Sequence, residues 1–195
     1  MATTDPVARE AELPPPSNED SELMRRVQGG DEVSLGVLMN RWERPVKSVI
    51  ARLVLNVREA DDLAQETFVH VWQHRLKFRP DAAFRPWIFS IAVNLARNRL
   101  RWWRRRPEVA LDEWIETADV NSGGVDHLER AERAAAIRDA IAALPSDLRE
   151  AIVLSEYEQL SQSEIALAVG TTRKAVESRT ARARERLRLA LRNLA

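Results

Sequence analysis

The sequence predicts an all-α protein made of two small helical domains joined by an acidic, flexible linker. Apolar residues recur at helical spacing along most of the 195-residue chain, and no segment shows the alternation of a strand. One acidic stretch beginning at Pro107 lacks this periodicity and contains NSGG (121–124), which indicates a linker. A hydrophobic content of 45% is enough for packed cores and excludes a chain disordered throughout.

Composition also sets the expected boundaries. The N-terminal residues are acidic and rich in proline, which predicts a disordered tail. Helical patterns follow, with breaks near Gly29–Gly30, Asn56 and 79–86. The predicted order is the tail, a first domain, the linker and a second domain, over residues 1–20, 21–106, 107–127 and 128–195.

Several classes of protein are disfavoured by what the chain lacks. There is no cysteine, so disulfides and thiolate metal sites are excluded. The N-terminus has no basic region followed by an apolar run, and no uncharged apolar stretch is long enough to cross a bilayer. We therefore expect a soluble, cytoplasmic protein.

The formal net charge is zero, yet charge is segregated along the chain. Residues 97–106 hold six arginines and no acid, and residues 171–195 hold eight basic residues against two acids. Residues 1–35 and 107–132 are acidic, with eight acids each. Basic patches of this density usually bind phosphate, which makes nucleic acid the expected partner; solvated helix faces are the alternative.

The first basic patch follows a predicted helix over residues 87–101. At about 100° per residue, polar side chains gather on one narrow stripe, and most apolar residues face a core. Amide and guanidinium groups on this stripe can donate to phosphates and base edges. Arg99 interrupts the apolar arc, and the pattern does not explain it. The stripe comprises Ser90, Asn94, Arg97, Asn98 and Arg101.

A proline-punctuated loop just upstream places aromatic rings beside cations. Rings of this kind suit unpaired bases, because every base has a face that can stack. The alternative is that the rings are ordinary core residues. The rings are Phe78, Phe84 and Trp87, and the cations are Lys77, Arg79 and Arg85.

Another helix is predicted to begin at Asn56, with Glu59 three residues later as a capping signal. Acidic and amide side chains gather in its first turns, where acids favour the positive end of the helix dipole. These are Asp61, Asp62, Gln65 and Glu66, with apolar contact from Leu63, Phe68 and Trp72. By itself this helix is more typical of an ordinary solvated surface than of a binding face.

The second basic patch lies in a predicted helix-turn-helix over residues 143–191. Pro145 precedes one helix, residues 161–169 form a supporting helix, and Gly170 suits the turn. A recognition helix from Thr172 buries side chains at spacings of three and four: Val176, Thr180, Ala183, Leu187 and Leu191. Its outward face presents Lys174, Glu177, Ser178, Ala181, Arg182, Glu185 and Arg188. Such a helix enters the major groove by its first residues; a generic helix pair is the alternative.

Two motifs, in this order, resemble the extracytoplasmic-function sigma factors of bacterial RNA polymerase. EADDLAQETFVHVW (59–72) is similar to the helix that docks on the polymerase largest subunit. FRPDAAFRPWIFSIAVNLARNRLR (78–101) is similar to the loop and helix that melt and read the −10 promoter element. The resemblance implies polymerase contacts from Asp61, Asp62, Leu63, Gln65, Glu66, Phe68 and Trp72. It implies −10 contacts from Lys77, Phe78, Arg79, Phe84, Arg85, Trp87, Asn94, Arg97, Asn98 and Arg101.

The helix-turn-helix is similar to the domain with which this family reads the −35 element. The resemblance implies DNA contacts from Thr172, Lys174, Glu177, Ser178, Arg179, Ala181, Arg182 and Arg184. Two positions depart from the family pattern: Glu177 stands where a basic residue is common, and Ala181 where a larger side chain can occur. A glutamate accepts from cytosine but repels phosphate, so we expect an altered sequence preference. Ser178 and Arg182 are the favoured base contacts.

The resemblance further implies a transcription initiation factor of a stress response, with core polymerase and promoter DNA as partners, no enzymatic activity and no cofactor. An anti-sigma factor that covers the polymerase-binding surface is an expected partner. Acidic linker residues could mimic nucleic acid in a basic channel, or the linker could be an unbound spacer. The linker acids are Asp112, Glu113, Glu116 and Asp119.

Two other classes of function are alternatives to a sigma factor. An autonomous helix-turn-helix regulator would use the second domain but leaves residues 59–101 unexplained. A metal enzyme could use His70 and His74, which share a helix face, but the glutamate of that zinc motif is absent and His127 lies in the linker region. Neither a phosphate-binding glycine loop nor a nucleophile with its base is present.

Overall fold

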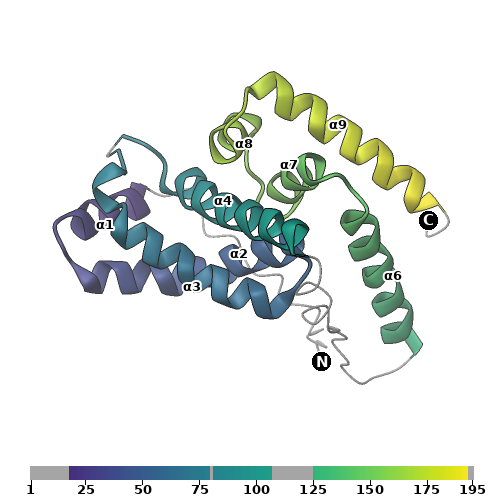
Figure 1. Ribbon diagram of the computed structural model, residues 1–195, viewed down its shortest axis with the longest axis horizontal. Coiled ribbons are helices and arrows are strands. Elements are labelled where there is room, and N and C mark those ends of the chain that lie inside the picture. The colour runs from purple at the N-terminus through teal and green to yellow at the C-terminus, as the bar shows by residue number, and fades with distance from the viewer. Residues whose placement is uncertain (1–17, 80, 107–124, 193–195) are drawn as a thin grey trace, which may run out of the picture.

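The computed structural model describes residues 18–79, 81–106 and 125–192, and within these ranges it is helical with no strand. This confirms the predicted all-α class (Figure 1). The first domain contains α1 (Asn18–Gln28), α2 (Glu32–Val54), α3 (Val57–Gln73), the 3-10 helix η1 (Arg75–Lys77) and α4 (Phe84–Arg105). The second contains α6 (Val125–Ala142), α7 (Ser146–Glu156), α8 (Gln162–Val169) and α9 (Arg173–Ala190). In the described part of the chain, no helix is both long and apolar enough to span a membrane.

Side-chain caps fix several of these helix starts. The Asn56 side chain accepts from the Glu59 backbone N–H at 3.1 Å, as the sequence predicted. At α8, Ser161 and Glu164 form a reciprocal capping box. Gly170 ends α8 at φ 69°, a left-handed conformation that glycine adopts without a Cβ clash. The turn of the helix-turn-helix therefore lies where the sequence placed it.

Trp42 is the centre of the first domain's core. It is fully buried, and its ring meets Phe84 and Phe89 edge-on with centroids 5.9 Å apart in both pairs. Its indole Nε1–H donates to Asp20 at 3.1 Å, and Arg41 forms an ion pair with the same carboxylate. The packing of α1, α2 and α4 therefore depends on one aromatic cluster with a buried polar partner.

Three predicted boundaries differ from the structure. Helix α1 begins at Asn18, inside the expected tail, because Asp20 is anchored to Trp42 and Arg41 in the core. Helix α4 begins at Phe84 rather than at 87, since proline is tolerated in a first helical turn, where Pro86 lies. Helix α6 begins at Val125, so helix replaces the last residues of the expected linker.

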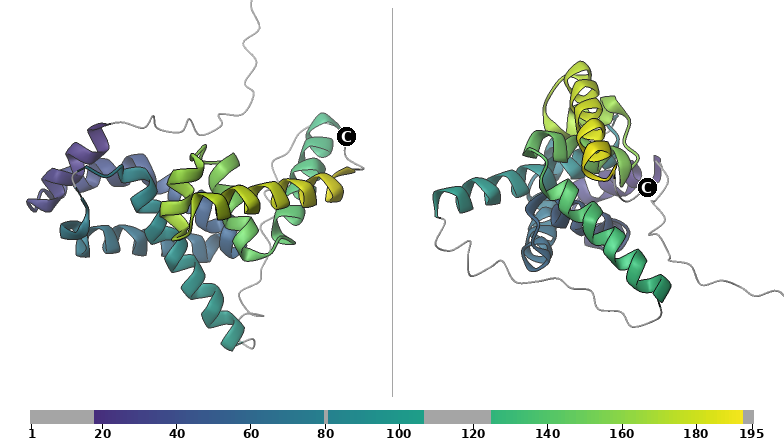
Figure 2. Two further views of the ribbon diagram at one scale, coloured as in Figure 1. Left: turned by 90° about the horizontal axis from the view of Figure 1, so that it is seen from above. Right: turned by 90° about the vertical axis from the view of Figure 1, so that its right-hand side faces the viewer.

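The two domains lie against each other. Helix α4 packs on α8, and α2 packs on α7 and α6 (Figure 1). One connected apolar core includes residues of both domains. The C-terminal turns of α4 extend past the neighbouring helices (Figure 2). Arg85 and Arg97 of α4 therefore lie against the second domain, and the Arg97 guanidinium is bonded to Glu150 of α7.

Candidate protein and nucleic-acid interfaces

The docking face expected on α3 is partly exposed and partly core. Asp62 and Gln65 are exposed on its surface, whereas Leu63 and Phe68 are buried in the first domain. Three more of the expected residues are partly exposed and have neighbours: Asp61 forms an ion pair with Lys47, Glu66 lies 3.6 Å from His70, and the ring of Trp72 stacks under the guanidinium of Arg75 at 4.2 Å. The surface that a partner could contact therefore includes Asp62 and Gln65 but excludes the buried side chains of Leu63 and Phe68.

Val69 belongs to the same exposed face, although it was not among the residues predicted from the sequence. Its side chain is 52% exposed, four residues after Gln65 and seven after Asp62. Residues at these intervals lie above one another on a helix. The signal was present in the spacing, but the neighbouring Phe68 was chosen as the apolar contact and it points into the core.

The aromatic rings of the expected base-capturing loop are packed together. Phe78 and Phe84 are each 2% exposed, and their centroids lie 6.1 Å apart. Trp87 is partly exposed and covers both rings, with its centroid 5.1 Å from that of Phe78. In this structure the core alternative therefore describes Phe78 and Phe84, and Trp87 is the ring at the surface. Lys77 and Arg79 are exposed beside this cluster.

The polar stripe of α4 is divided between solvent and the second domain. Asn94, Asn98 and Arg101 are exposed, and Arg101 donates to the Asn98 side chain. Arg97 instead forms a bidentate ion pair with Glu150 of α7, and this hydrogen bonding raises the pKa of Arg97. Arg85 is buried, and desolvation lowers its pKa. Two of the expected DNA-contacting arginines thus face protein.

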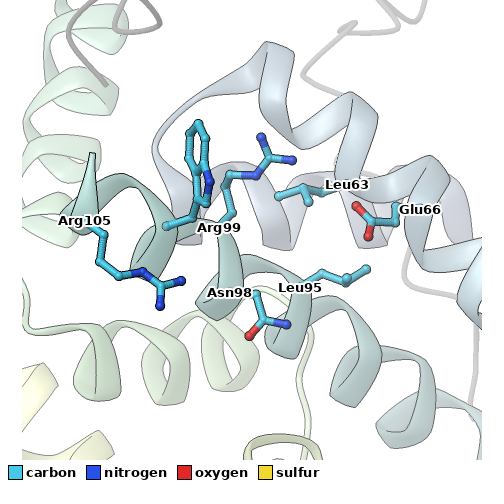
Figure 3. A pocket seen from close by; sticks show the side chains of 7 residues that line it. Leu63, Glu66, Leu95, Asn98, Arg99 and Arg105 are labelled. Carbon is cyan, nitrogen blue, oxygen red and sulfur yellow. The ribbon is translucent and has the colours of Figure 1, made fainter. Parts of the chain in front are cut away.

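Arg99, unexplained by the helical pattern, binds α3. Its guanidinium lies 2.7 Å from the buried carboxylate of Glu59. Arg99 also lines a groove of about 440 Å³ between α3 and α4 (Figure 3). The groove borders both the docking helix and the polar stripe, and it is lined by Leu63, Glu66, Leu95, Asn98, Arg99, Trp102 and Arg105.

Helix α9 presents the expected −35 residues almost completely. Its side chains Val176, Thr180 and Ala183 are buried against α7 and α8, as predicted. Thr172 caps the helix by accepting from the Ala175 backbone N–H at 3.2 Å. Arg179 and Arg184 contact the acids Asp147 and Glu156 of α7. The exposed face carries Lys174, Glu177, Ser178, Ala181 and Arg182.

Two other predictions concern a histidine metal site and the acidic linker. The ring of His70 on α3 stacks on that of His74, which follows the end of the helix, with centroids 5.3 Å apart; no group of three or more His, Asp or Glu side chains suited to a metal occurs among the described residues. The acidic linker residues, Asp112 to Asp119, lie outside the described ranges.

Both domains match known families. Sigma-70 region 2 matches residues 38–106, and Sigma-70 region 4 matches residues 134–187. The RNA polymerase sigma-H factor of Pseudomonas aeruginosa is 36% identical over 187 residues, covering 90% of this chain and 95% of that protein. The ECF RNA polymerase sigma-E factor of Escherichia coli is 36% identical over 174 residues, covering 85% and 91%.

Solved structures give the same fold. CnrH in complex with the cytosolic domain of CnrY has a TM-score of 0.68 and 28% identity, covering 91% of this chain and 99% of CnrH. The sigma factor RpoE of Bartonella quintana, solved with the anti-sigma factor NepR, has a TM-score of 0.65 and 23% identity, covering 80% and 96%. Region 2 and region 4 in this order, over nearly the whole length of the sigma-H and sigma-E relatives, establish that the chain belongs to the extracytoplasmic-function sigma factors of bacterial RNA polymerase.

Proposed function

We propose that this sigma factor docks on core RNA polymerase through the exposed face of α3, reads and melts the −10 element with the 77–87 loop and α4, and reads the −35 element with α9. The observation that carries the proposal is the presence of two different exposed faces in one chain. The α3 face is acidic and amide-bearing, and the α9 face is largely basic. An autonomous regulator would need only the second.

Energetics favour a polymerase partner. Separating DNA strands costs roughly 1.4 kcal/mol per base-pair step, and each stacked base returns roughly 1–3 kcal/mol. Trp87 is the ring at the surface of its cluster, while Phe78 and Phe84 would have to leave the core to stack. A site of this size can capture a base or two, so the larger bubble needs a larger cationic protein.

We also propose that an anti-sigma partner controls the protein, and that it works in the cytoplasm without enzymatic activity. CnrH, of similar fold and 28% identical, was solved with the cytosolic domain of CnrY bound. The exposed α3 face is a suitable target for such a partner, because covering Asp62, Gln65 and Val69 would block polymerase docking.

Docking is tested with Asp62→Ala and Gln65→Ala, using Asp139→Ala on α6 as a matched exposed control. We expect each docking variant to bind purified core polymerase about tenfold more weakly, a change of about 1.4 kcal/mol, with the fold unchanged. The control should bind as the natural protein does. Equal binding by all three variants would contradict the docking face. Tight, specific binding to duplex DNA without polymerase would favour the autonomous regulator.

Melting is tested with Trp87→Ala. Phe78→Ala is less informative, because truncating a buried phenylalanine costs about 3–5 kcal/mol of stability. The holoenzyme carrying Trp87→Ala should form less abortive product on duplex promoters from a library, and a template with an unpaired −10 region should restore synthesis. A defect that persists on the unpaired template would place the role of Trp87 outside melting.

A further inference from the structure

Arg99 occupies a core-facing position of α4. It lies four residues after Leu95 and four before Trp103, and side chains at these intervals share one face of a helix. Leu95 and Trp103 are 7% and 6% exposed, so this face is turned toward the core of the first domain. A charged side chain therefore stands in a row where the helical pattern calls for an apolar one.

The partner of Arg99 is a carboxylate in the first turn of α3. Nη1 of Arg99 lies 2.7 Å from Oε1 of Glu59, and the Glu59 side chain is 7% exposed. The Asn56 side chain caps this turn at the Glu59 backbone N–H, which fixes the backbone that carries the carboxylate. Asp62 of the exposed docking face follows three residues later. The ion pair thus joins the start of the docking helix to the promoter-reading helix.

On α4 this ion pair lies among the residues expected to read the −10 element. Asn98 precedes Arg99, Arg101 follows it by two residues, and both are exposed. Arg101 donates to the side-chain oxygen of Asn98. Figure 3 shows the Arg99 side chain directed toward α3 and that of Asn98 directed away from it. Since successive side chains on a helix are about 100° apart, fixing the direction of Arg99 also fixes that of Asn98.

Stability alone does not account for a charged pair at this position. Replacing a buried ion pair by apolar residues of similar volume is often neutral or stabilising. An ion pair does favour one separation, because moving the charges apart leaves a buried carboxylate without its cation. Apolar side chains can slide past one another, since the hydrophobic effect has no direction. The charged pair therefore differs from an apolar contact chiefly in the register that it imposes on the two helices.

The place of the pair on α4 makes this register important. The C-terminal turns of α4 extend past the neighbouring helices (Figure 2). Asn98 and Arg101 lie at the base of this extension, so a small rotation or shift of the helix would turn both away from a base edge. Recognition of a base edge depends on the placement of each donor and acceptor.

We propose that Glu59 and Arg99 are positioning residues for −10 recognition: their ion pair holds α4 in one register against the docking helix, so that Asn98 and Arg101 meet the promoter in the orientation that discriminates between bases. This inference rests on the proposed function and adds a determinant of specificity to it. In this role neither Glu59 nor Arg99 contacts DNA. Breaking the pair should reduce −10 discrimination without weakening polymerase binding.

The first test uses the full chain carrying Glu59→Gln, with Glu132→Gln on the exposed surface of α6 as the control for the loss of one carboxylate. Each holoenzyme is assembled with purified core polymerase, and abortive product is measured on a library of −10 sequences. The ratio of product from the preferred sequence to that from its single-base variants should fall at least about fivefold for Glu59→Gln and stay unchanged for the control. Affinity for core polymerase should stay within about twofold of that of the natural protein.

Two results of this first test would overturn the proposal. Unchanged discrimination by Glu59→Gln would show that the pair does not position the reading residues. If Arg99 contacts DNA directly, releasing it from Glu59 should instead increase product from every sequence.

A second variant separates positioning from stability. Glu59→Met combined with Arg99→Met removes both charges and leaves no buried charge without a partner. This variant should melt at the same temperature as the natural protein or at a higher one, and it should still lose at least about fivefold in −10 discrimination. Discrimination equal to that of the natural protein would show that apolar packing is enough to position α4, which would overturn the proposal.

A conservative substitution and a map of the affected bases complete the test. Arg99→Lys keeps a cation that can pair with Glu59, so it should retain most of the discrimination; a loss as large as that of the Glu59→Met, Arg99→Met variant would contradict a positioning role. The bases at which Glu59→Gln loses discrimination should be those at which Asn98→Ala or Arg101→Ala loses it. A loss spread evenly over the −10 element would contradict an effect transmitted through these two residues.

Failure of the proposed function gives a different result. A natural protein that neither binds core polymerase nor favours any −10 sequence would contradict the proposed function itself. A natural protein that discriminates between −10 sequences, with a Glu59→Met, Arg99→Met variant that discriminates equally well, would contradict the positioning role alone.

Discussion

Helices α4 and α9 are both arginine-rich and are both expected to contact promoter DNA, yet their side chains are in different situations. On α9, Lys174, Ser178 and Arg182 are exposed, and the helix is held by a small apolar face. On α4, Arg85 and Arg97 face carboxylates of the other domain. Only one of the two surfaces is ready for DNA.

The difference follows from what each surface has to bind. A recognition helix meets an existing duplex groove, so a rigid, exposed face is sufficient. A strand-separating surface is useful only after polymerase is present, and a free cationic site of that kind would bind any nucleic acid through charge alone.

The largest expected effect comes from Arg149→Ala, which removes a half-buried cation and leaves the carbonyls of Leu53, Ile141, Ala142 and Leu144 without this donor. We expect a loss of about 4 kcal/mol in the free energy of unfolding, measured by urea denaturation. Arg138→Ala, on an exposed site of α6, is the control and should change stability by less than about 0.5 kcal/mol. A loss of that smaller size for Arg149→Ala would show that it does not join the domains.

The second-largest expected effect is a dependence of the free energy of unfolding on pH, caused by Glu158. Burial raises the pKa of Glu158 to about 7, against the partly opposing charges of Arg85 and Arg52, whereas its ordinary value is 4.5. The folded chain therefore holds this proton more tightly than the unfolded chain does. The contribution of the Glu158 carboxyl to the free energy of unfolding is fully present below about pH 4.5. It is lost as the pH rises toward 7 and above, and the loss is at most about 3 kcal/mol.

Glu158→Gln should remove that slope, because an amide does not ionise. Unfolding measured between pH 5 and pH 8 should then show a smaller decrease with pH than the natural protein, and the variant should be the more stable of the two at pH 8. A slope unchanged by the substitution would mean that other groups cause it and that Glu158 ionises without cost.

Features of the structure set by contacts between neighbouring residues could be predicted from the sequence, and those set by contacts between distant residues could not. Asn56, Ser161 and Gly170 act on the next few residues, and the sequence located their helix ends because local hydrogen bonds and φ preferences set them. Arg97 and Arg99 bind acids on other helices, with Glu150 lying 53 residues from Arg97. A helical stripe shows that a residue points outward, but not that another domain covers it.

The rings illustrate a second limit. Phe78, Phe84 and Trp87 share a composition that suits both a core and a stacking site, and the sequence left the two alternatives open. The exposed fraction of each ring distinguishes the two alternatives: Phe78 and Phe84 are 2% exposed and belong to the core, whereas Trp87 is partly exposed. Val69 was missed for a related reason: its spacing from Asp62 and Gln65 places it on their face, but the larger apolar side chain of Phe68 beside it suggested a contact there instead.

On the exposed face of α9, Arg182→Ala should lower the affinity of the holoenzyme for a −35-dependent promoter about tenfold, or about 1.4 kcal/mol. Its side chain is exposed, and its Nε donates to the Ser178 carbonyl of its own helix at 3.3 Å, so the substitution should change the free energy of unfolding little. Arg138→Ala is the control, because that arginine is exposed on α6 and is not among the expected DNA contacts. Equal losses for the two variants would indicate general charge rather than base contact.

The smallest expected effect sharpens the idea that α9 is preformed. Thr172→Ala removes the side-chain oxygen that accepts from the Ala175 N–H, and should cost about 1 kcal/mol of stability. Because Lys174 and Ser178 lie in the first turns after this cap, fraying would also disorganise the DNA face. Thr172→Ser keeps the cap and serves as the control, with hydrogen exchange of the first α9 amides as the measurement. If exchange in the two variants is equally slow, the cap contributes nothing and rigidity comes from Val176 and Thr180 packed beneath the helix. If exchange quickens only in Thr172→Ala, and −35 affinity falls with it, the order of the free helix is part of how α9 binds a duplex.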